Sequence, residues 1–489
     1  MVSTGDTQPP SQYGSVDNVI NHCEFEVSVI REPSVDDDHS DIEYFEGVIQ
    51  NVLSIEIRES IDQFYRTGLV TLADRSSLRE LLPLTGNEIL SVSYKNRFHS
   101  SSADLKRKII HFKIFHIEEY ENLENRNARP GASYINLHLV EWPAFDFLST
   151  VVYQTFPISH LVEGGEKGST LVENLLKGIH GFENYYDIDV DPSPEDLRFH
   201  NFYIPRWTIT KTLQYINDFM INQSGHPYYF FGIRSNPGGA GHKPTAMYHS
   251  IYSYFEGDHF RTYSTTKPDT LLTKPAPSQV ADNTENVNNS IPRPEDDNNY
   301  DPLDTILGRQ LDFGNSLNIF QKRTAGRTVL NYDYREGNQH KALDYRNFIK
   351  NYTTLGNTMV NPKDMNFGNQ WKVYETVPYN NEQMSDAFLK NRMARGTFKE
   401  MFMTATCPVN ETRILGEKAA LFLTTPIQER AIDYQMSGRW MTYSIVDIIT
   451  SSGYATSEVT FARDSFWLTE GNYLDRSVNI WQDDISELR

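Results

Sequence analysis

Three aspartates at alternate positions give the sequence its clearest candidate for metal binding. Asp187, Asp189 and Asp191 have the spacing with which a calcium-binding loop begins. Such a loop needs a glycine where Pro192 stands and a bidentate glutamate where Arg198 stands. We therefore interpret the segment as an acidic turn, and the sequence leaves open whether a metal occupies it.

Histidines form the second candidate set. His111, His116 and His138 fall on expected strands of one sheet. No cysteine or carboxylate is spaced among them in the manner of a zinc-binding motif, so we interpret them as surface or cross-strand residues. The sequence predicts no metal site and no cofactor.

Residues suited to catalysis are present without the spacing that a known mechanism requires. The glycine-rich segment 237–244 has the wrong glycine spacing for a phosphate-binding loop, and Pro244 interrupts the helix start that would bind phosphate. A glycosidase needs two facing carboxylates, and the sequence assigns that geometry to none of Glu118, Glu119 and Asp146. No nucleophile elbow or His-Glu-x-x-His helix is present. We predict no catalytic residues and no enzymatic activity.

The elements that would position a site are mostly β-strands. In the region 24–142, apolar residues alternate with polar ones, as at Leu53, Ile55 and Ile57, which is typical of half-buried antiparallel strands. A second region, 305–465, ends in four expected strands, at 397–406, 413–423, 440–450 and 456–466. Each region has the length and pattern of a small barrel, which suggests one fold used twice.

The middle segment, 143–262, changes period and predicts an α+β domain. Two amphipathic helices are expected, one capped by Ser169 and one after Trp207. Their apolar stripes are Leu171, Val172, Leu175, Leu176 and Ile179 in the first, and Leu213, Ile216 and Met220 in the second. Strands at 228–233 and 245–255 are expected to form a hairpin.

The rest of the chain has a less regular pattern. Proline, asparagine and aspartate dominate 264–303, as in a linker or long surface loop. A strand pair is expected within 310–324, an irregular insertion at 331–384 and a helix at 385–395.

Composition excludes several classes of function. The 489 residues carry 65 acidic and 45 basic side chains, a net charge of −20, which argues against a surface that grips DNA phosphates. We interpret the basic cluster Lys106-Arg107-Lys108 as a solvated strand start. No apolar window is long enough for a membrane helix, and the polar N-terminus lacks the pattern of a signal peptide. Cys23 and Cys407 fit a reducing compartment without a disulfide, so we expect synthesis in a cytoplasm.

The order of these elements resembles the central hub of contractile-phage baseplates, the T4-like baseplate hub family. The clearest stretch has Ile55-Glu56-Ile57-Arg58-Glu59-Ser60 at the end of one strand and Leu84-Thr85-Gly86-Asn87-Glu88-Ile89 at the start of another. Three more matches follow in order: Ile204-Pro205-Arg206-Trp207-Thr208, Ile306-Leu307-Gly308-Arg309-Gln310 and Tyr443-Ser444-Ile445-Val446-Asp447. The shared order, over most of 45–465, carries the resemblance.

The resemblance implies a mainly β fold of two tube-type antiparallel split β-barrels, the second interrupted by an insertion, plus a helix-containing domain. It also implies a homotrimer whose barrels form a pseudo-six-fold ring. Such a ring adapts a hexameric tail tube to a trimeric central spike and leaves a channel for DNA. The implied partners are the spike, the tube or its initiator and the surrounding baseplate proteins, with DNA only in transit and no membrane. The implied location is the virion tail baseplate, after synthesis in the host cytoplasm.

Under this resemblance the acidic balance has two open interpretations, a lumen that repels DNA phosphates or simple solubility. The expected domains are a polar N-terminal tail (1–22), a first tube-type barrel (23–142), the α+β domain (143–262), the linker (263–303), a second tube-type barrel (304–330 and 385–468) with its insertion (331–384), and a C-terminal tail (469–489).

Two alternatives stay open. One is a carbohydrate-binding or carbohydrate-cleaving β protein with Trp142, Trp207 and Tyr228-Tyr229-Phe230 as pocket walls. The other is a different structural tail component, such as a tube-capping or wedge protein. The sequence leaves open the host, the partner-contact residues and the roles of the two tails and the linker.

Overall fold

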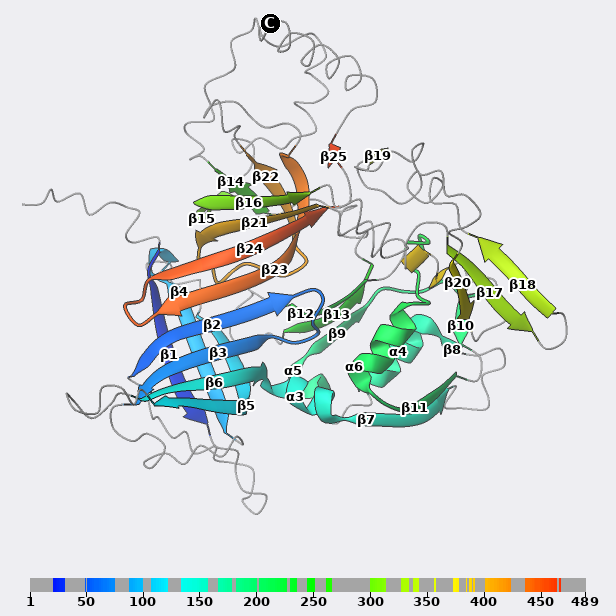
Figure 1. Cartoon of the computed structure of the whole chain (residues 1–489), viewed down its shortest axis with the longest axis horizontal. Helices are drawn as coiled ribbons and strands as arrows, with labels where there is room; N and C mark the ends of the chain where they lie inside the picture. Colours follow the sequence, from blue (N-terminus) through cyan, green and yellow to red (C-terminus); the bar gives the residue numbers. More distant parts are fainter. Residues whose placement is uncertain are drawn as a thin grey trace, which may run out of the picture.

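The fold is mainly β, with most of the helices in the middle of the chain (Figure 1). The described residues of the helix expected at 385–395, such as Ala387 and Phe388, are also helical. The computed structural model describes residues 21–30, 49, 51–74, 88–99, 107–121, 133–156, 166–177, 182–199, 202–226, 229–234, 244–250, 261–265, 300–313, 327–333, 337–342, 356–357, 373–377, 384, 387–388, 390–391, 401–423, 436–463 and 466–467.

Six strands of the first barrel region form a curled antiparallel sheet. Their order in space is β1-β4-β5-β6-β3-β2. The strands are β1 (Cys23–Ile30), β2 (Val52–Ser60), β3 (Thr67–Asp74), β4 (Ile89–Asn96), β5 (Lys108–Glu121) and β6 (Ser133–Glu141). The alternation read from the sequence is confirmed for Ile55 and Ile57, which are each 1% exposed and face the core, whereas Arg58 faces outwards. It is wrong at Leu53, because a register shift between Val52 and Ser54 buries Val52 instead.

A second sheet repeats this arrangement in the C-terminal region. Its order is β14-β22-β23-β24-β21-β16, with β15 beside β14. The strands are β14 (Arg261–Ser264), β15 (Tyr300–Thr305), β16 (Gly308–Phe313), β21 (Met401–Pro408), β22 (Lys418–Phe422), β23 (Gly438–Thr450) and β24 (Ala455–Arg463). Its core contains Trp440, Phe461 and Met403, each 0% exposed.

The two sheets share one topology, strand for strand. β2, β3, β4, β5 and β6 correspond in chain order and in spatial order to β16, β21, β22, β23 and β24. The outermost strand differs, because β1 is antiparallel to β4 whereas β14 is parallel to β22. The interpretation of one fold used twice therefore holds for the core strands of each sheet.

The interruption of the second sheet falls between β16 and β21. Residues 61–66 join the corresponding strands β2 and β3, whereas residues 314–400 join β16 and β21. The sequence predicted an irregular stretch at 331–384, but β17 (Arg327–Asp333), β18 (Gly337–Ala342) and β20 (Val373–Val377) form a separate three-stranded sheet. The prediction failed because these strands, notably the polar β18, lack an apolar alternation. Of the strand pair expected within 310–324, only β16 lies in the described residues.

The helices pack in the middle region beside the first sheet (Figure 1). The predicted stripe residues of α4 (Gly168–Lys177) and α6 (Ile209–Asn217) are buried and share a core with Phe64 and Phe388. Ile179, expected in the first stripe, lies outside the described residues, and Met220, expected in the second, is buried just after α6 ends. Thr208 caps α6, but α4 begins one residue before Ser169, whose backbone N–H donates to the Ser193 hydroxyl (3.1 Å). No helix among the described residues has the length and apolar character needed to cross a membrane.

The predicted hairpin is present as β12 (Tyr229–Arg234) and β13 (Thr245–His249), which pair antiparallel. The expected linker is bounded by strands, since Tyr263 and Ser264 belong to β14 and residues 300–303 to β15; the residues between lie outside the described part. The remaining elements are η1 (Arg97–His99), α3 (Trp142–Ser149), β7 (Val151–Phe156), β8 (Glu166–Lys167), α5 (Phe182–Tyr185), β9 (Asp187–Val190), β10 (Arg198–Phe199), β11 (Phe202–Thr208), β19 (Gly356–Asn357) and β25 (Phe466–Trp467).

Candidate assembly interface

The two sheets meet where β2 pairs with β23. The first part of β23, as far as Met441, pairs with β22; from Ser444 onward the same edge pairs antiparallel with β2. β24 follows β23 along its other edge. The result is one continuous 13-stranded sheet in which β23 belongs to both halves (Figure 1). An edge strand of the first sheet is thus covered by the second, which removes its unpaired backbone groups from solvent.

Buried polar contacts connect the two halves. The Tyr94 hydroxyl in β4 donates to Asp447 Oδ2 in β23 (2.7 Å), and the Asn96 side-chain amide donates to the Val409 carbonyl (2.7 Å). Burial, reinforced by the charge of Asp447, raises the pKa of the Tyr94 phenol well above its ordinary value. Because buried polar groups are costly without partners, these contacts favour one arrangement of the two sheets.

A buried ion cluster lies at one end of the first sheet. Lys108 Nζ is 2.7 Å from Glu59 Oε1, and Arg66 donates from Nε to Glu141 Oε2 (3.0 Å). All four residues are at most 9% exposed. The interpretation of residues 106–108 as a solvated strand start is therefore wrong for Lys108. Its partner Glu59 lies on the same inward face of β2 as Ile55 and Ile57, and the sequence pattern does not reveal that Lys108 meets it. Arg107 does lie at the surface, where it pairs with Glu24 and Glu26.

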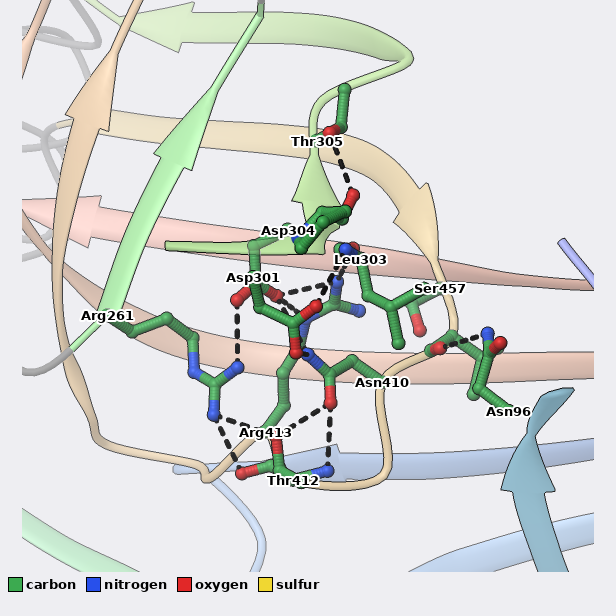
Figure 2. Close-up of polar contacts among 12 residues, drawn as sticks. Asn96, Arg261, Asp301, Leu303, Asp304, Thr305, Asn410, Thr412, Arg413 and Ser457 are labelled. Carbon is green, nitrogen blue, oxygen red and sulfur yellow. Dashed lines mark hydrogen bonds and ion pairs between the residues drawn. The ribbon is translucent and has the colours of Figure 1, made fainter. Parts of the chain in front are cut away.

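A second ion cluster holds β14 and β15 in place (Figure 2). Arg261 lies between Asp304 (2.8 Å) and Glu417 (3.0 Å), and Arg413 Nε donates to the same Asp304 (3.1 Å). Asn410 adds a hydrogen bond to Asp301 (3.0 Å). Asp304 and Arg413 are 0% and 1% exposed. Because removing one partner would leave an uncompensated buried charge, the cluster fixes this segment to the second sheet.

The repeat gives β5 and β23 matching positions. β5 pairs with β4 as far as Lys113, is bulged between Ile114 and His116, and continues beside β6. β23 pairs with β22 as far as Met441, is bulged between Thr442 and Ser444, and continues beside β24. Lys113 therefore corresponds to Met441 and His116 to Ser444. The match extends across both sheets, as one row of residues paired from strand to strand shows. In the first sheet the row is Glu56, Leu69, His138 and His116; in the second sheet it is Gln310, Thr404, Thr460 and Ser444.

Within the chain, β2 pairs with the second half of β23. Their counterparts in the repeat, β16 and the second half of β5, do not pair with each other. The edge of β23 beyond its bulge is covered by β2, whereas no described strand covers the corresponding edge of β5. Likewise β2 pairs on both sides, whereas β16 pairs only with β21 among the described strands. Exposed apolar side chains accompany both edges: Phe115 and Tyr120 in β5 are 56% and 55% exposed, and Leu307 before β16 is 54% exposed. The β5 edge and β16 thus form a candidate interface between copies of the chain.

The histidines interpreted as cross-strand residues include one such pair. His116 lies opposite His138, and its ring centroid is 5.2 Å from that of His138. The structure adds Glu118, whose carboxylate is 3.4 Å from His116 and 3.3 Å from His138. Sequence reasoning found no carboxylate spaced among the histidines, yet Glu118 follows His116 by two residues and therefore shares its face of the strand. His111 does not join this group.

Two of the three aspartates lie on a strand rather than in a turn, and Asp191 directly follows it. Asp187 and Asp189 belong to β9, which pairs parallel with β13. His249 Nε2 is 3.0 Å from Asp189, and Asp191 accepts the Ser250 N–H (3.1 Å). The turn interpretation was wrong because the partner strand β13 comes from far along the chain.

The aromatic residues considered as pocket walls come from different elements. Trp207 packs against Tyr215 at 5.1 Å with Lys211 over its ring, while Trp142 begins α3. The side chains of Asp146, Tyr229 and Phe230, residue Tyr228 and most of 237–244 lie outside the described residues. Cys23 and Cys407 are buried free thiols, as expected, and burial raises the pKa of Cys407 to about 12.

Comparisons with known proteins give structural likeness at low identity. No family model and no curated protein matches the chain. A tail protein from Neisseria meningitidis MC58 is 9% identical with a TM-score of 0.48, over 91% of this chain and 98% of that one. The 43 kDa tail protein of prophage MuSo2 from Shewanella oneidensis is 8% identical with a TM-score of 0.49, over 91% and 100%. A chain of the half-lidded Francisella PdpA-VgrG complex is 10% identical with a TM-score of 0.46, over 90% and 57%.

Proposed function

We propose that the chain is a structural hub subunit of a contractile tail baseplate, of which three copies form a ring between a hexameric tail tube and a trimeric central spike. The observation that carries the proposal is the internal repeat, with two sheets of one topology joined edge to edge within one chain. The joint is head-to-tail, because it pairs β2 of one sheet with β23, the counterpart of β5, in the other.

A head-to-tail contact of this kind generates rings when it repeats with a constant rotation. Each chain uses the contact once internally and presents the matching edges, the second half of β5 and β16, at its two ends. β16 of one copy would pair antiparallel with β5 of the next. Three chains would then form six such joints, three within chains and three between them.

The internal joint also defines the register of the proposed one. Glu56 lies opposite Ile448 in the pair of β2 with β23. The corresponding residues are Gln310 in β16 and Tyr120 in β5, by the matching cross-strand rows described above. Gln310 of one copy is therefore expected opposite Tyr120 of its neighbour, a register that brings Leu311 and the exposed Tyr120 to the same seam.

A ring of six similar sheets built from three chains has six-fold character towards a tube and three-fold character towards a spike. This symmetry supplies the adaptor role, and the ring would surround a channel wide enough for DNA to pass. No bound nucleic acid is needed for this role, which agrees with the net charge of −20.

The test is the mass of the purified protein by light scattering, alone and mixed with a candidate spike protein. We expect a trimer, or a monomer that becomes a trimer when the spike is added. A monomer under both conditions would contradict the proposal, and binding of that monomer to polysaccharide would favour a carbohydrate-active protein. Hexamers would instead indicate another tail component.

A further inference from the structure

The β-bulge in β5 places two histidines and a glutamate on one patch of the sheet. Because Phe115 is the extra residue, His116 rather than Phe115 lies opposite His138 in β6. Glu118, two residues along β5, projects from the same face. The ligand atoms of His116, Glu118 and His138 all lie within 4.8 Å of one another.

Each histidine nitrogen lies at about tetrahedral ligand spacing from one oxygen of the Glu118 carboxylate. His116 Nε2 is 3.4 Å from Glu118 Oε1, and His138 Nε2 is 3.3 Å from Glu118 Oε2. Zinc with four tetrahedral ligands at about 2.0–2.2 Å holds those ligand atoms about 3.3–3.6 Å apart. Two imidazoles and one carboxylate are also a donor set that suits zinc and similar transition metals rather than calcium or magnesium.

The surroundings orient the ligands. The Tyr120 hydroxyl donates to Glu118 Oε2 (3.1 Å), which holds the carboxylate toward the histidines. His138 Nε2 is shielded from solvent yet has no well-aligned hydrogen-bond partner. In the neutral tautomer that carries its proton on Nδ1, this nitrogen has a lone pair to offer a metal. The side chains remain accessible from outside, with 56% of His116 and 36% of Glu118 exposed, so an ion has an entry path.

We propose that His116, Glu118 and His138 bind one divalent transition-metal ion of the zinc class, with a fourth position open to water. The ion joins β5 to β6 on the part of β5 that β4 does not reach, and so stiffens the edge that faces a neighbouring copy. Binding requires only these two strands of a single chain, so it is independent of ring formation.

The test is a titration of the metal-free full chain with Zn²⁺ by isothermal titration calorimetry, and with Co²⁺ by visible absorption. We expect one saturable Zn²⁺ per chain and the intense absorption bands of tetrahedral Co²⁺. His116→Gln and His138→Gln should each weaken Zn²⁺ binding at least tenfold. His111→Gln is the matched control, because His111 lies on the same strand outside the cluster and its loss should leave the affinity unchanged.

Circular dichroism and thermal melting would establish that each variant is folded, and Zn²⁺ should raise the melting temperature of the wild type and of His111→Gln alone. Absence of saturable binding would overturn the proposal, as would an affinity that both cluster variants retain or that His111→Gln also loses. Light scattering of the same samples reports ring formation separately.

Discussion

Tyr443 and Phe115 occupy the same bulged position in the two copies of the repeated sheet, but Tyr443 is 7% exposed and Phe115 is 56% exposed. At Tyr443 the segment that follows β2 in the same chain covers the strand. The Ile61 N–H donates to the Tyr443 carbonyl (3.1 Å), and the Tyr443 hydroxyl donates to Asp62. At Phe115 no described segment provides the equivalent cover. The difference in exposure between the two side chains indicates how much of Phe115 a second copy of the chain would cover.

The proposed register can be tested with a disulfide. Because Gln310 and Tyr120 correspond to the paired residues Glu56 and Ile448, Gln310→Cys with Tyr120→Cys should form a cross-link between chains. Non-reducing electrophoresis should show species of two and three chains that reduction returns to one. The matched control, Glu56→Cys with Ile448→Cys, should cross-link within a single chain, since those residues pair there. Oxidation that yields only monomers in the first variant while the control closes would exclude this register.

Removal of the two aromatic side chains at the bulges should affect different properties, folding stability for Tyr443 and trimer formation for Phe115. Tyr443→Ala should lower the free energy of unfolding by about 3 kcal/mol, because it empties a buried aromatic site. Phe115→Ala should change that free energy by less than about 0.5 kcal/mol, because the side chain is exposed in the single chain. The same Phe115→Ala variant should weaken trimer formation in light scattering. Full trimer formation by this variant would show that Phe115 lies outside the interface.

The ion cluster at Asp304 should be essential for folding of the second sheet. Arg413→Met removes one of the two arginines that pair with the buried Asp304 and leaves only Arg261 beside it, which is expected to cost about 3 kcal/mol. Arg58→Met is the control, because 62% of the Arg58 side chain is exposed and its pair with Glu56 should contribute less than about 1 kcal/mol. Chemical denaturation followed by fluorescence reports this region through the buried Trp440. Equal effects of the two substitutions would mean that the cluster contributes little.

Acid should weaken the first sheet through Glu59. Burial alone would raise the pKa of this carboxyl, but the charges of Lys108 and Arg66 outweigh burial and lower the pKa below its ordinary value. A lowered folded-state pKa gives stability that is present above the unfolded value, about 4.3, and is lost as the pH falls through the folded value. The free energy of unfolding should therefore decrease in that acid range. Glu59→Gln should flatten the decrease, whereas substitution of the exposed Glu458 by glutamine should retain it.

The sequence by itself determined the class of fold and the position of its main elements. Alternation at Ile55 and Ile57, and helical stripes such as that of α4, record burial against a nearby core. Burial constrains residue type at every second or every third to fourth position. The same reasoning missed the polar strand β18, because its residues carry no apolar alternation.

Tertiary structure alone decided which residues meet. The pair of Glu59 with Lys108, the pair of Asp304 with Arg413 and the joining of His138 to His116 and Glu118 all depend on strand register, which local sequence does not encode. The open edges of β5 and β16 are likewise a property of topology. They become visible only because the chain closes the equivalent joint, β2 with β23, within itself.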